Sequence, residues 1–121
     1  MTVIYKNKVL GAGACAEEFR PMNMFIIFGS SAPAELKDFC YLVDVNPIEG
    51  TIEAGDTLRI DDADYRITSV GDEAPVTLAG LGHCTINFSG LTEPEMAGTI
   101  YVEKAPLPQI QTGTTIQIIK A

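Results

Sequence analysis

Short runs of alternating or continuously apolar residues occupy most of the chain. The segment MNMFIIF (22–28) is almost uninterrupted in apolar residues, which predicts a central strand. The segments DTLRI (56–60) and YRITSV (65–70) alternate on either side of DDAD (61–64), which predicts a hairpin with a four-residue acidic turn. Further strands are expected over TVIYKNKVL, CTINF, TIYVE and TTIQII (2–10, 84–88, 99–103 and 114–119).

Helical signals are few. SSAPAELKDFC (30–40) carries the clearest one, because Ser31 can cap, Pro33 suits a first turn and Glu35 favours a helix N-terminus. EAPVTLAGLG (73–82) is expected to hold a turn or two, with Gly82 as its stop. About seven or more short strands with so little helix predict an all-β fold: a small closed or partly open antiparallel β-barrel or sandwich with one short helix. With no linker, residues 1–121 are expected to form a single domain.

Two segments resemble each other within the chain. IEAGDTLRI (52–60) and IQTGTTIQI (110–118) share the pattern I-x-x-G-x-T-[LI]-x-I. Each predicts a tight glycine turn that leads into a strand, so similar corners are expected to recur in one closed sheet.

Charge and cysteine usage narrow the class of function. The net charge of −8 disfavours nucleic acid and anionic membrane as partners. The longest apolar run is about five residues against the roughly 20 of a bilayer span, and the N-terminus lacks a signal-peptide layout. A cytoplasmic protein with no membrane insertion is expected. Three cysteines without a C-x-x-C predict buried free thiols and no metal site or cofactor.

Two motifs have a functional and a structural interpretation. GAGACA (11–16) matches the G-x-G-x-x-A fingerprint for dinucleotides, but Pro21 follows too soon for the long helix that binds the pyrophosphate. A glycine-rich corner is therefore favoured. DDAD (61–64) could ligate a cation, yet the additional oxygen ligands are not evident, so a solvated turn is favoured.

His83 is the single histidine of the chain. If 83–88 is a strand, its period of two places Cys84, Ile86 and Phe88 on the apolar face. His83, Thr85 and Asn87 then share the polar face, in a position that suits either an accessible, oriented imidazole or an ordinary surface histidine.

The chain resembles the sorbitol/glucitol-specific enzyme IIA component of the bacterial phosphotransferase system. The stretches that carry the resemblance run from Met1 to about Ile119 and are MTVIY, APAELKDFCYL, GTIEAGDTLRI, YRITSVG, LGHCTINFSGL and MAGTIYV. The resemblance implies a small, mainly β cytoplasmic protein. Such a protein accepts a phosphoryl group on a histidine from the phosphocarrier protein HPr. It then passes the group to the IIB part of a sorbitol permease, whose IIB and IIC components phosphorylate the sugar as it enters.

One departure from the family concerns the phosphorylated histidine. The resemblance places that residue in the segment CYLVDVNP (40–47), where this chain has Val43, and a second histidine often matches Val45. Valine cannot carry a phosphoryl group. Two hypotheses follow: His83 serves as acceptor instead, or the chain is a diverged, non-catalytic binding or regulatory paralogue. Asp44 as an aspartyl-phosphate acceptor is a remote third.

The chemistry of transfer constrains the first hypothesis. An acceptor histidine needs one unprotonated nitrogen, and a hydrogen bond to the other nitrogen should fix its tautomer. Hydrogen-bond donors should meet the phosphoryl group. Thr85 and Asn87 are the candidates for that substrate-binding role, because they are expected on the same face as His83.

Overall fold

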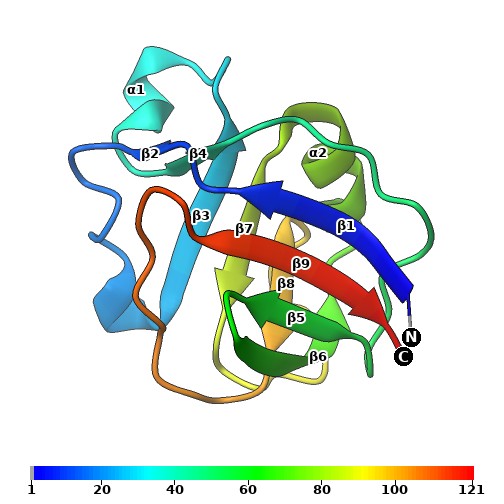
Figure 1. Ribbon diagram of the computed structural model, residues 1–121. Helices are drawn as coiled ribbons and strands as arrows, with labels where there is room; N and C mark the ends of the chain where they lie inside the picture. The colour runs from blue at the N-terminus through cyan, green and yellow to red at the C-terminus, as the bar shows by residue number, and fades with distance from the viewer. Residues whose placement is uncertain (1) are drawn as a thin grey trace.

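The computed structural model describes residues 2–121; Met1, which the predicted domain includes, lies outside them. All nine strands belong to one strongly curled sheet in the order β1-β9-β5-β6-β8-β7-β3-β4-β2, so the fold is a half-barrel (Figure 1). The strands are β1 (Thr2–Lys8), β2 (Gly11–Ala12), β3 (Met24–Gly29), β4 (Tyr41–Val43), β5 (Thr57–Ile60), β6 (Ala63–Val70), β7 (Cys84–Asn87), β8 (Thr99–Val102) and β9 (Thr115–Lys120). The helices are η1 (Arg20–Met22), α1 (Ala34–Lys37) and α2 (Ala74–Leu81).

The mainly β prediction is confirmed, and two details of it differ. The sheet is mixed, since β3 runs parallel to β4 and β7 runs parallel to β8. Two short α-helices are present instead of one, and the longer is α2. Helix α1 begins after Pro33 and spans one turn, and the Ser31 side chain does not cap it. None of the helices in residues 2–121 has the length and apolar character needed to cross a membrane.

The predicted acidic turn is shorter than expected. Strands β5 and β6 pair up to Ile60 and Ala63, so the turn holds two residues rather than four. Asp61 adopts a left-handed backbone with φ of 51°, a conformation that aspartate tolerates better than most residues. Asp64 lies in β6, where it forms an exposed ion pair with Arg59 at 2.6 Å. Asp61 Oδ1 instead accepts from the Thr115 N–H at 2.9 Å, so the carboxylates of Asp61 and Asp64 have different partners.

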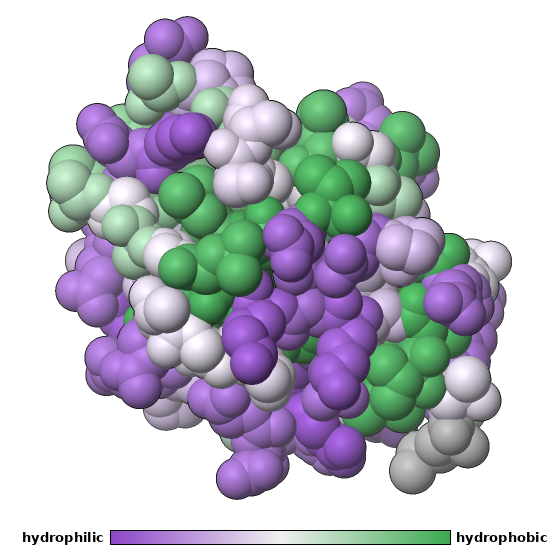
Figure 2. All heavy atoms as spheres, turned by 45° about the horizontal axis from the view of Figure 1, so that its top comes forward, coloured by the Kyte–Doolittle hydropathy of each residue, from purple (hydrophilic) through white to green (hydrophobic). Residues whose placement is uncertain are grey.

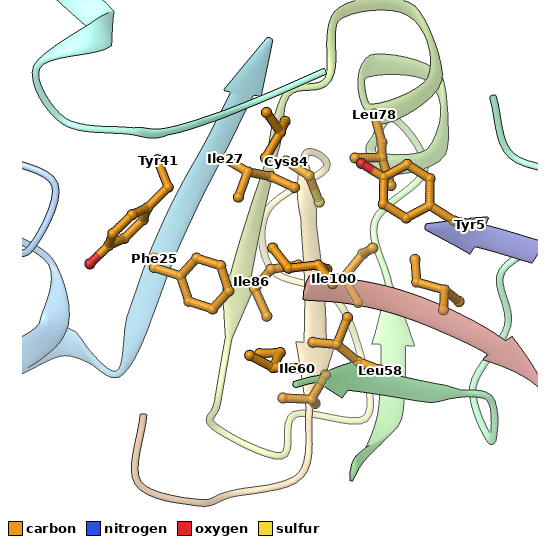
Figure 3. Close-up of a cluster of buried hydrophobic side chains, with 14 of the residues drawn as sticks. Tyr5, Phe25, Ile27, Tyr41, Leu58, Ile60, Leu78, Cys84, Ile86 and Ile100 are labelled. Atoms are coloured by element: carbon orange, nitrogen blue, oxygen red, sulfur yellow. The ribbon is translucent and has the colours of Figure 1, made fainter. Parts of the chain in front are cut away.

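Strand alternation builds the core inside the curl. Side chains from opposite strands meet there, including Phe25, Ile27, Leu58, Ile86 and Ile100 (Figure 3). All five are at most 2% exposed. Burying such side chains supplies the main driving force for folding.

One buried side chain closes the open side of the half-barrel. Asn7 in β1 is 4% exposed, and its amide bonds to both backbone groups of Asp44. Its Nδ2 donates to the Asp44 carbonyl at 2.6 Å and to Tyr5 Oη at 2.8 Å. Its Oδ1 accepts from the Asp44 N–H at 3.2 Å and from the Lys8 N–H at 2.9 Å. We call the contact between β1 and the segment that follows β4 the seam. There, the Asn7 side chain takes the place of backbone pairing between strands.

Along the same seam, Asn46 Nδ2 donates to the Lys6 carbonyl and the Glu49 N–H donates to the Ile4 carbonyl. The segment after β4 therefore covers the free edge of β1. This arrangement blunts an edge that could otherwise pair with another chain.

The two similar segments form the same turn. Gly55 and Gly113 have φ of 98° and 96°, which glycine adopts without strain. In each turn a buried polar residue then caps a backbone N–H three residues earlier: Asp56 accepts from Glu53, and Thr114 accepts from Gln111. The turns lead into β5 and β9, which pair with each other.

Asp56 carries further bonds that Thr114 lacks. Its carboxylate accepts from the Ala121 N–H at 3.0 Å and from Lys120 Nζ at 3.1 Å. Burial by itself would raise the pKa of Asp56. The hydrogen bonds from the Ala121 and Glu53 N–H groups and from Lys120 outweigh it and hold the pKa below its usual value.

Replacing Asp56 by asparagine is therefore expected to destabilise the protein by about 1–3 kcal/mol at neutral pH. A carboxyl whose folded-state pKa is depressed stabilises the fold above its unfolded pKa, and this stabilisation fades as pH falls through the folded-state value. The difference between the two proteins should thus shrink below about pH 4. Urea unfolding from pH 7 to pH 3 measures it, with exposed Asp72→Asn as the control. A pH-independent difference would contradict this role for the charge.

Candidate functional site

The junction between α2 and β7 fixes the backbone of His83. Helix α2 ends at Gly82, whose left-handed φ of 69° lets the chain turn into the strand. The His83 N–H then donates to the Thr77 carbonyl at 3.1 Å, and Thr77 Oγ1 donates to the His83 carbonyl at 2.7 Å. Both backbone groups of His83 are thereby bonded to one helical residue.

The predicted alternation along this strand is what the structure shows. Cys84, Ile86 and Phe88 are buried on the inner face, each at most 2% exposed. His83 and Thr85 are half-buried on the outer face.

The imidazole of His83 is held on two sides. Its Nδ1 lies 3.4 Å from the Ile27 carbonyl oxygen, and the Phe28 ring stacks on it with centroids 4.3 Å apart and planes 27° apart. With the proton on Nδ1, the ring donates to Ile27 and leaves the Nε2 lone pair available. Nε2 makes no hydrogen bond within residues 2–121. The ring therefore meets the geometric needs of a nucleophile with a fixed tautomer.

A small apolar cluster that includes Phe28 supports the His83 ring. Phe28, Ala32 and Cys40 form it on the outer face, with Ile26 packed against it. In the sequence, helix α1 lies between Ala32 and Cys40. Its single turn connects these two residues, which belong to the same cluster as Phe28. Sequence patterns did not identify Phe28 or Thr77 as supports, because their contacts with His83 come from pairing between β3 and β7 and from the end of α2.

The backbone beside His83 lies against the segment that follows Val43. A methyl group added to Gly82 would come within 2.9 Å of the Gly29 nitrogen and 3.3 Å of the Asp44 carbonyl oxygen. Such contacts leave room for glycine alone. His83 is therefore next to the stretch to which the resemblance assigns the phosphorylated histidine, although it comes from another strand.

Val43 itself has no access to solvent. It belongs to β4, points into the barrel and is 0% exposed. Val45, two residues on, is 46% exposed, and the Asp44 side chain is exposed while its backbone is bonded to Asn7. The side chain at position 43 of this chain contributes to the core and cannot reach a partner protein.

The two predicted helpers differ in position. Thr85 follows His83 on the same face, about 7 Å along the strand. Asn87 is about 13 Å away along the strand by the same spacing. Its Nδ2 faces Met24 Sδ at 3.9 Å, and its Oδ1 is buried without a hydrogen bond among the described residues. By strand spacing, Thr85 is therefore the nearer of the two to His83 along the chain.

Two of the cationic side chains, Arg20 and Lys120, are engaged away from His83. Arg20 donates to the Leu107 and Pro108 carbonyls, and Lys120 pairs with Glu53 and Asp56. In the part of the chain that the structure describes, His83 has no ion-pair partner.

The two buried cysteines, Cys40 and Cys84, are poor nucleophiles and ligands. Burial raises the pKa of Cys84 to about 12 and also raises that of Cys40, so both remain thiols at neutral pH. No group of three or more His, Cys, Asp or Glu side chains within residues 2–121 is arranged to hold a metal ion. After β2, the GAGACA segment continues in turns and the 3-10 helix η1, so the α-helix required by a dinucleotide site is not formed over 13–22.

Hydrophobic side chains are exposed around this end of the sheet. They are Leu36, Phe39, Val45, Val76 and Leu81, each at least 37% exposed. Figure 2 shows apolar surface gathered in patches on the end of the molecule where α1, α2 and β4 lie in Figure 1, with a hydrophilic band between them. Exposed apolar patches rimmed by polar residues are typical of protein-binding surfaces.

Comparison with known proteins agrees with the resemblance. Residues 4–117 match the family described as the glucitol/sorbitol-specific IIA component of the phosphotransferase system. Curated proteins of that description from Shigella flexneri and Escherichia coli are each 35% identical over 108 residues, which covers 89% of this chain and 87% of theirs. A crystal structure of a phosphotransferase system IIA component from Enterococcus faecalis superposes with a TM-score of 0.82 at 28% identity, covering 96% of this chain and 100% of that chain. The chain therefore belongs to the glucitol/sorbitol-specific IIA component family of the phosphotransferase system.

Proposed function

We propose that this protein is a phosphocarrier that receives a phosphoryl group from HPr on Nε2 of His83 and passes it to a IIB domain. The observation that carries this proposal is the His83 imidazole, held by Ile27 and Phe28 with Nε2 unengaged, beside the segment 44–45. Family membership supplies the type of reaction.

The proposed step uses few groups. The Nε2 lone pair attacks phosphorus, a bond between nitrogen and phosphorus forms, and the bond from phosphorus to HPr breaks. The proton stays on Nδ1, so the ring becomes cationic, and the Ile27 carbonyl stabilises that charge. Thr85, two residues along the same face, is the side chain that we propose donates a hydrogen bond to the phosphoryl oxygens. In the second step IIB takes the group and the ring becomes neutral again.

The partners follow from the same proposal. HPr and the IIB domain dock in turn on the exposed apolar side chains around His83, and the IIC component of the permease carries the polyol. We infer that residues 1–121 act as one cytoplasmic domain in this relay. The acidic surface indicated by the net charge of −8 favours partners with a basic docking face.

The test is a mass measurement on the intact protein. After incubation with phosphoenolpyruvate, enzyme I and HPr, we expect the mass to increase by one phosphoryl group. The modification should be lost on brief acid treatment, as a bond between phosphorus and nitrogen is acid-labile while an ester is not. Omitting HPr is the control, and should leave the mass unchanged. An unmodified protein in the complete mixture would exclude the phosphocarrier function.

A second candidate function has an observation of its own. Val43 is fully buried, at the position to which the resemblance assigns the phosphorylated histidine. A chain without that acceptor could bind HPr or the permease as a regulator. That protein would bind HPr in a pull-down and still show no change in mass, which separates the two functions.

A further inference from the structure

Phe28 is a large aromatic side chain on the outer face of the sheet. Strand alternation points Ile27 into the main core and Phe28 to the opposite face. Phe28 is nevertheless only 7% exposed. It belongs to a separate small cluster, whose other buried members are Ala32 and Cys40. Packing of the main core therefore does not account for this ring.

The pairing of β3 with β7 places Phe28 opposite His83. The antiparallel register sets Ile27 opposite Cys84, so the next two positions, Phe28 and His83, form a cross-strand pair on the outer face. Their rings stack with centroids 4.3 Å apart and planes 27° apart. The contact thus follows from the register of the sheet and does not depend on a flexible loop.

The two supports of the imidazole differ in strength. The distance of 3.4 Å from Nδ1 to the Ile27 carbonyl oxygen is long, because N–H···O hydrogen bonds usually measure about 2.9–3.0 Å. Phe28, in contrast, covers one face of the imidazole and limits its rotation about the bond to Cβ. Phe28 is therefore the stronger constraint on the orientation of the His83 ring.

The stack also bears on the charge of the ring. Among residues 2–121, no carboxylate lies within ion-pairing distance of His83. The face of a phenyl ring carries partial negative charge and attracts a cation whose centre lies within about 6 Å. The stacked Phe28 ring is well inside that range, so it stabilises a cationic imidazole more than a neutral one.

We propose that Phe28 is a positioning residue for phosphoryl transfer, an inference that rests on the proposed function of His83. Its ring keeps Nδ1 directed at the Ile27 carbonyl and Nε2 free to react. When the bond from Nε2 to phosphorus forms and the bond from phosphorus to HPr breaks, the proton stays on Nδ1 and the ring becomes cationic. Phe28 stabilises that charge, and it takes no part in the bonds that form and break.

The single histidine makes the orientation of the ring directly measurable. In untagged protein labelled with ¹⁵N only in histidine, the ring signals come from His83 alone. At about pH 9, where an ordinary imidazole is neutral, we expect the parent to show a protonated Nδ1 and an unprotonated Nε2. Phe28→Leu should move both signals towards the average of the two tautomers, because the weak bond to Ile27 then acts alone.

The equilibrium of transfer from phosphorylated HPr measures the effect on charge. Phe28→Leu should lower the equilibrium constant about two- to fivefold, which corresponds to a contact between a cation and an aromatic ring at a partly exposed site. Phe28→Tyr keeps the ring and should restore both the nitrogen signals and the equilibrium. Phe19→Leu is the matched control, since that ring pairs with Phe39 and not with His83, and it should behave as the parent does.

A second variant guards against a loss of folding in Phe28→Leu. Phe28→Met fills the same space with an unbranched chain that has no ring, and the backbone amide spectrum reports whether each variant is folded. Nitrogen signals like those of the parent in the folded Leu or Met variant would overturn the proposal. An unchanged equilibrium constant would also overturn it, and would leave Phe28 as a packing residue.

Failure of the proposed function has a different signature. A parent protein that accepts no phosphoryl group would overturn that function, together with the effect of Phe28 on transfer. The nitrogen spectra need neither phosphoenolpyruvate nor HPr. They therefore decide independently whether Phe28 fixes the orientation of the imidazole.

Discussion

His83→Gln is expected to abolish phosphoryl acceptance entirely. Glutamine keeps a polar side chain of moderate size that can still donate to the Ile27 carbonyl, but it has no nitrogen lone pair that can attack phosphorus. The variant should fold like the parent, since His83 is half-buried and its backbone bonds to Thr77 do not involve the imidazole. The intact mass after incubation with phosphoenolpyruvate, enzyme I and HPr measures the effect.

Two further variants sharpen this result. Asp44→Asn leaves the imidazole intact and should accept the phosphoryl group as the parent does, which also tests the aspartyl-phosphate alternative. Thr85→Val removes the neighbouring hydroxyl and should slow transfer by about five- to tenfold without preventing it, the effect of one lost hydrogen bond. Persistent phosphorylation of His83→Gln would show that another residue is the acceptor.

Asn7→Leu is expected to have the largest effect on stability. Leucine has the same branched shape as asparagine, although it is larger, and it leaves the N–H and carbonyl of Asp44 and the hydroxyl of Tyr5 without their partner. Buried polar groups that lose a partner cost about 1–3 kcal/mol each, partly relieved by water. A loss of about 3 kcal/mol is expected, which is a large share of the roughly 5–15 kcal/mol of a typical domain. Equilibrium unfolding in urea measures it.

Asn46→Ala provides the control at the same seam. It removes a single exposed hydrogen bond, from Asn46 Nδ2 to the Lys6 carbonyl, and should cost less than about 1 kcal/mol. Equal losses in the two variants would show that the seam is held by its packing and not by the Asn7 amide.

The period-two pattern predicted the surroundings of His83 because it depends only on local geometry. Alternation along 83–88 separates the outer imidazole from buried Cys84 and Ile86, and the structure has the same arrangement. The glycine turns at Gly55 and Gly113 were predictable for a similar reason, since positive φ favours glycine over other residues.

Features that depend on distant partners could not be predicted in this way. The segment 61–64 looked like a four-residue turn, but pairing between β5 and β6 extends to within two residues of its tip. Parallel pairing of β3 with β4 and of β7 with β8 leaves no mark in the alternation of a single strand. Asn7 stands between two lysines in a polar stretch, and nothing there indicates that it is buried at the seam.

The candidate site shows the same division. The strand pattern predicts that His83 and Thr85 share a face. The distance from His83 to Asn87 needs the structure, which shows that β7 is paired through Asn87 with both β3 and β8. The Ile27 carbonyl and the Phe28 ring are contributed by a strand more than fifty residues earlier. Their role depends on the register between β3 and β7, which the sequence pattern does not specify.

The position of β9 between β1 and β5 has a consequence for how the chain folds. Within the described residues, the ladder of β1 is formed with β9, more than a hundred residues later in the chain. Closing so long a loop costs chain entropy before the pairing is gained. We therefore expect β1 to dock late in folding, after the locally paired hairpin of β5 and β6 has formed.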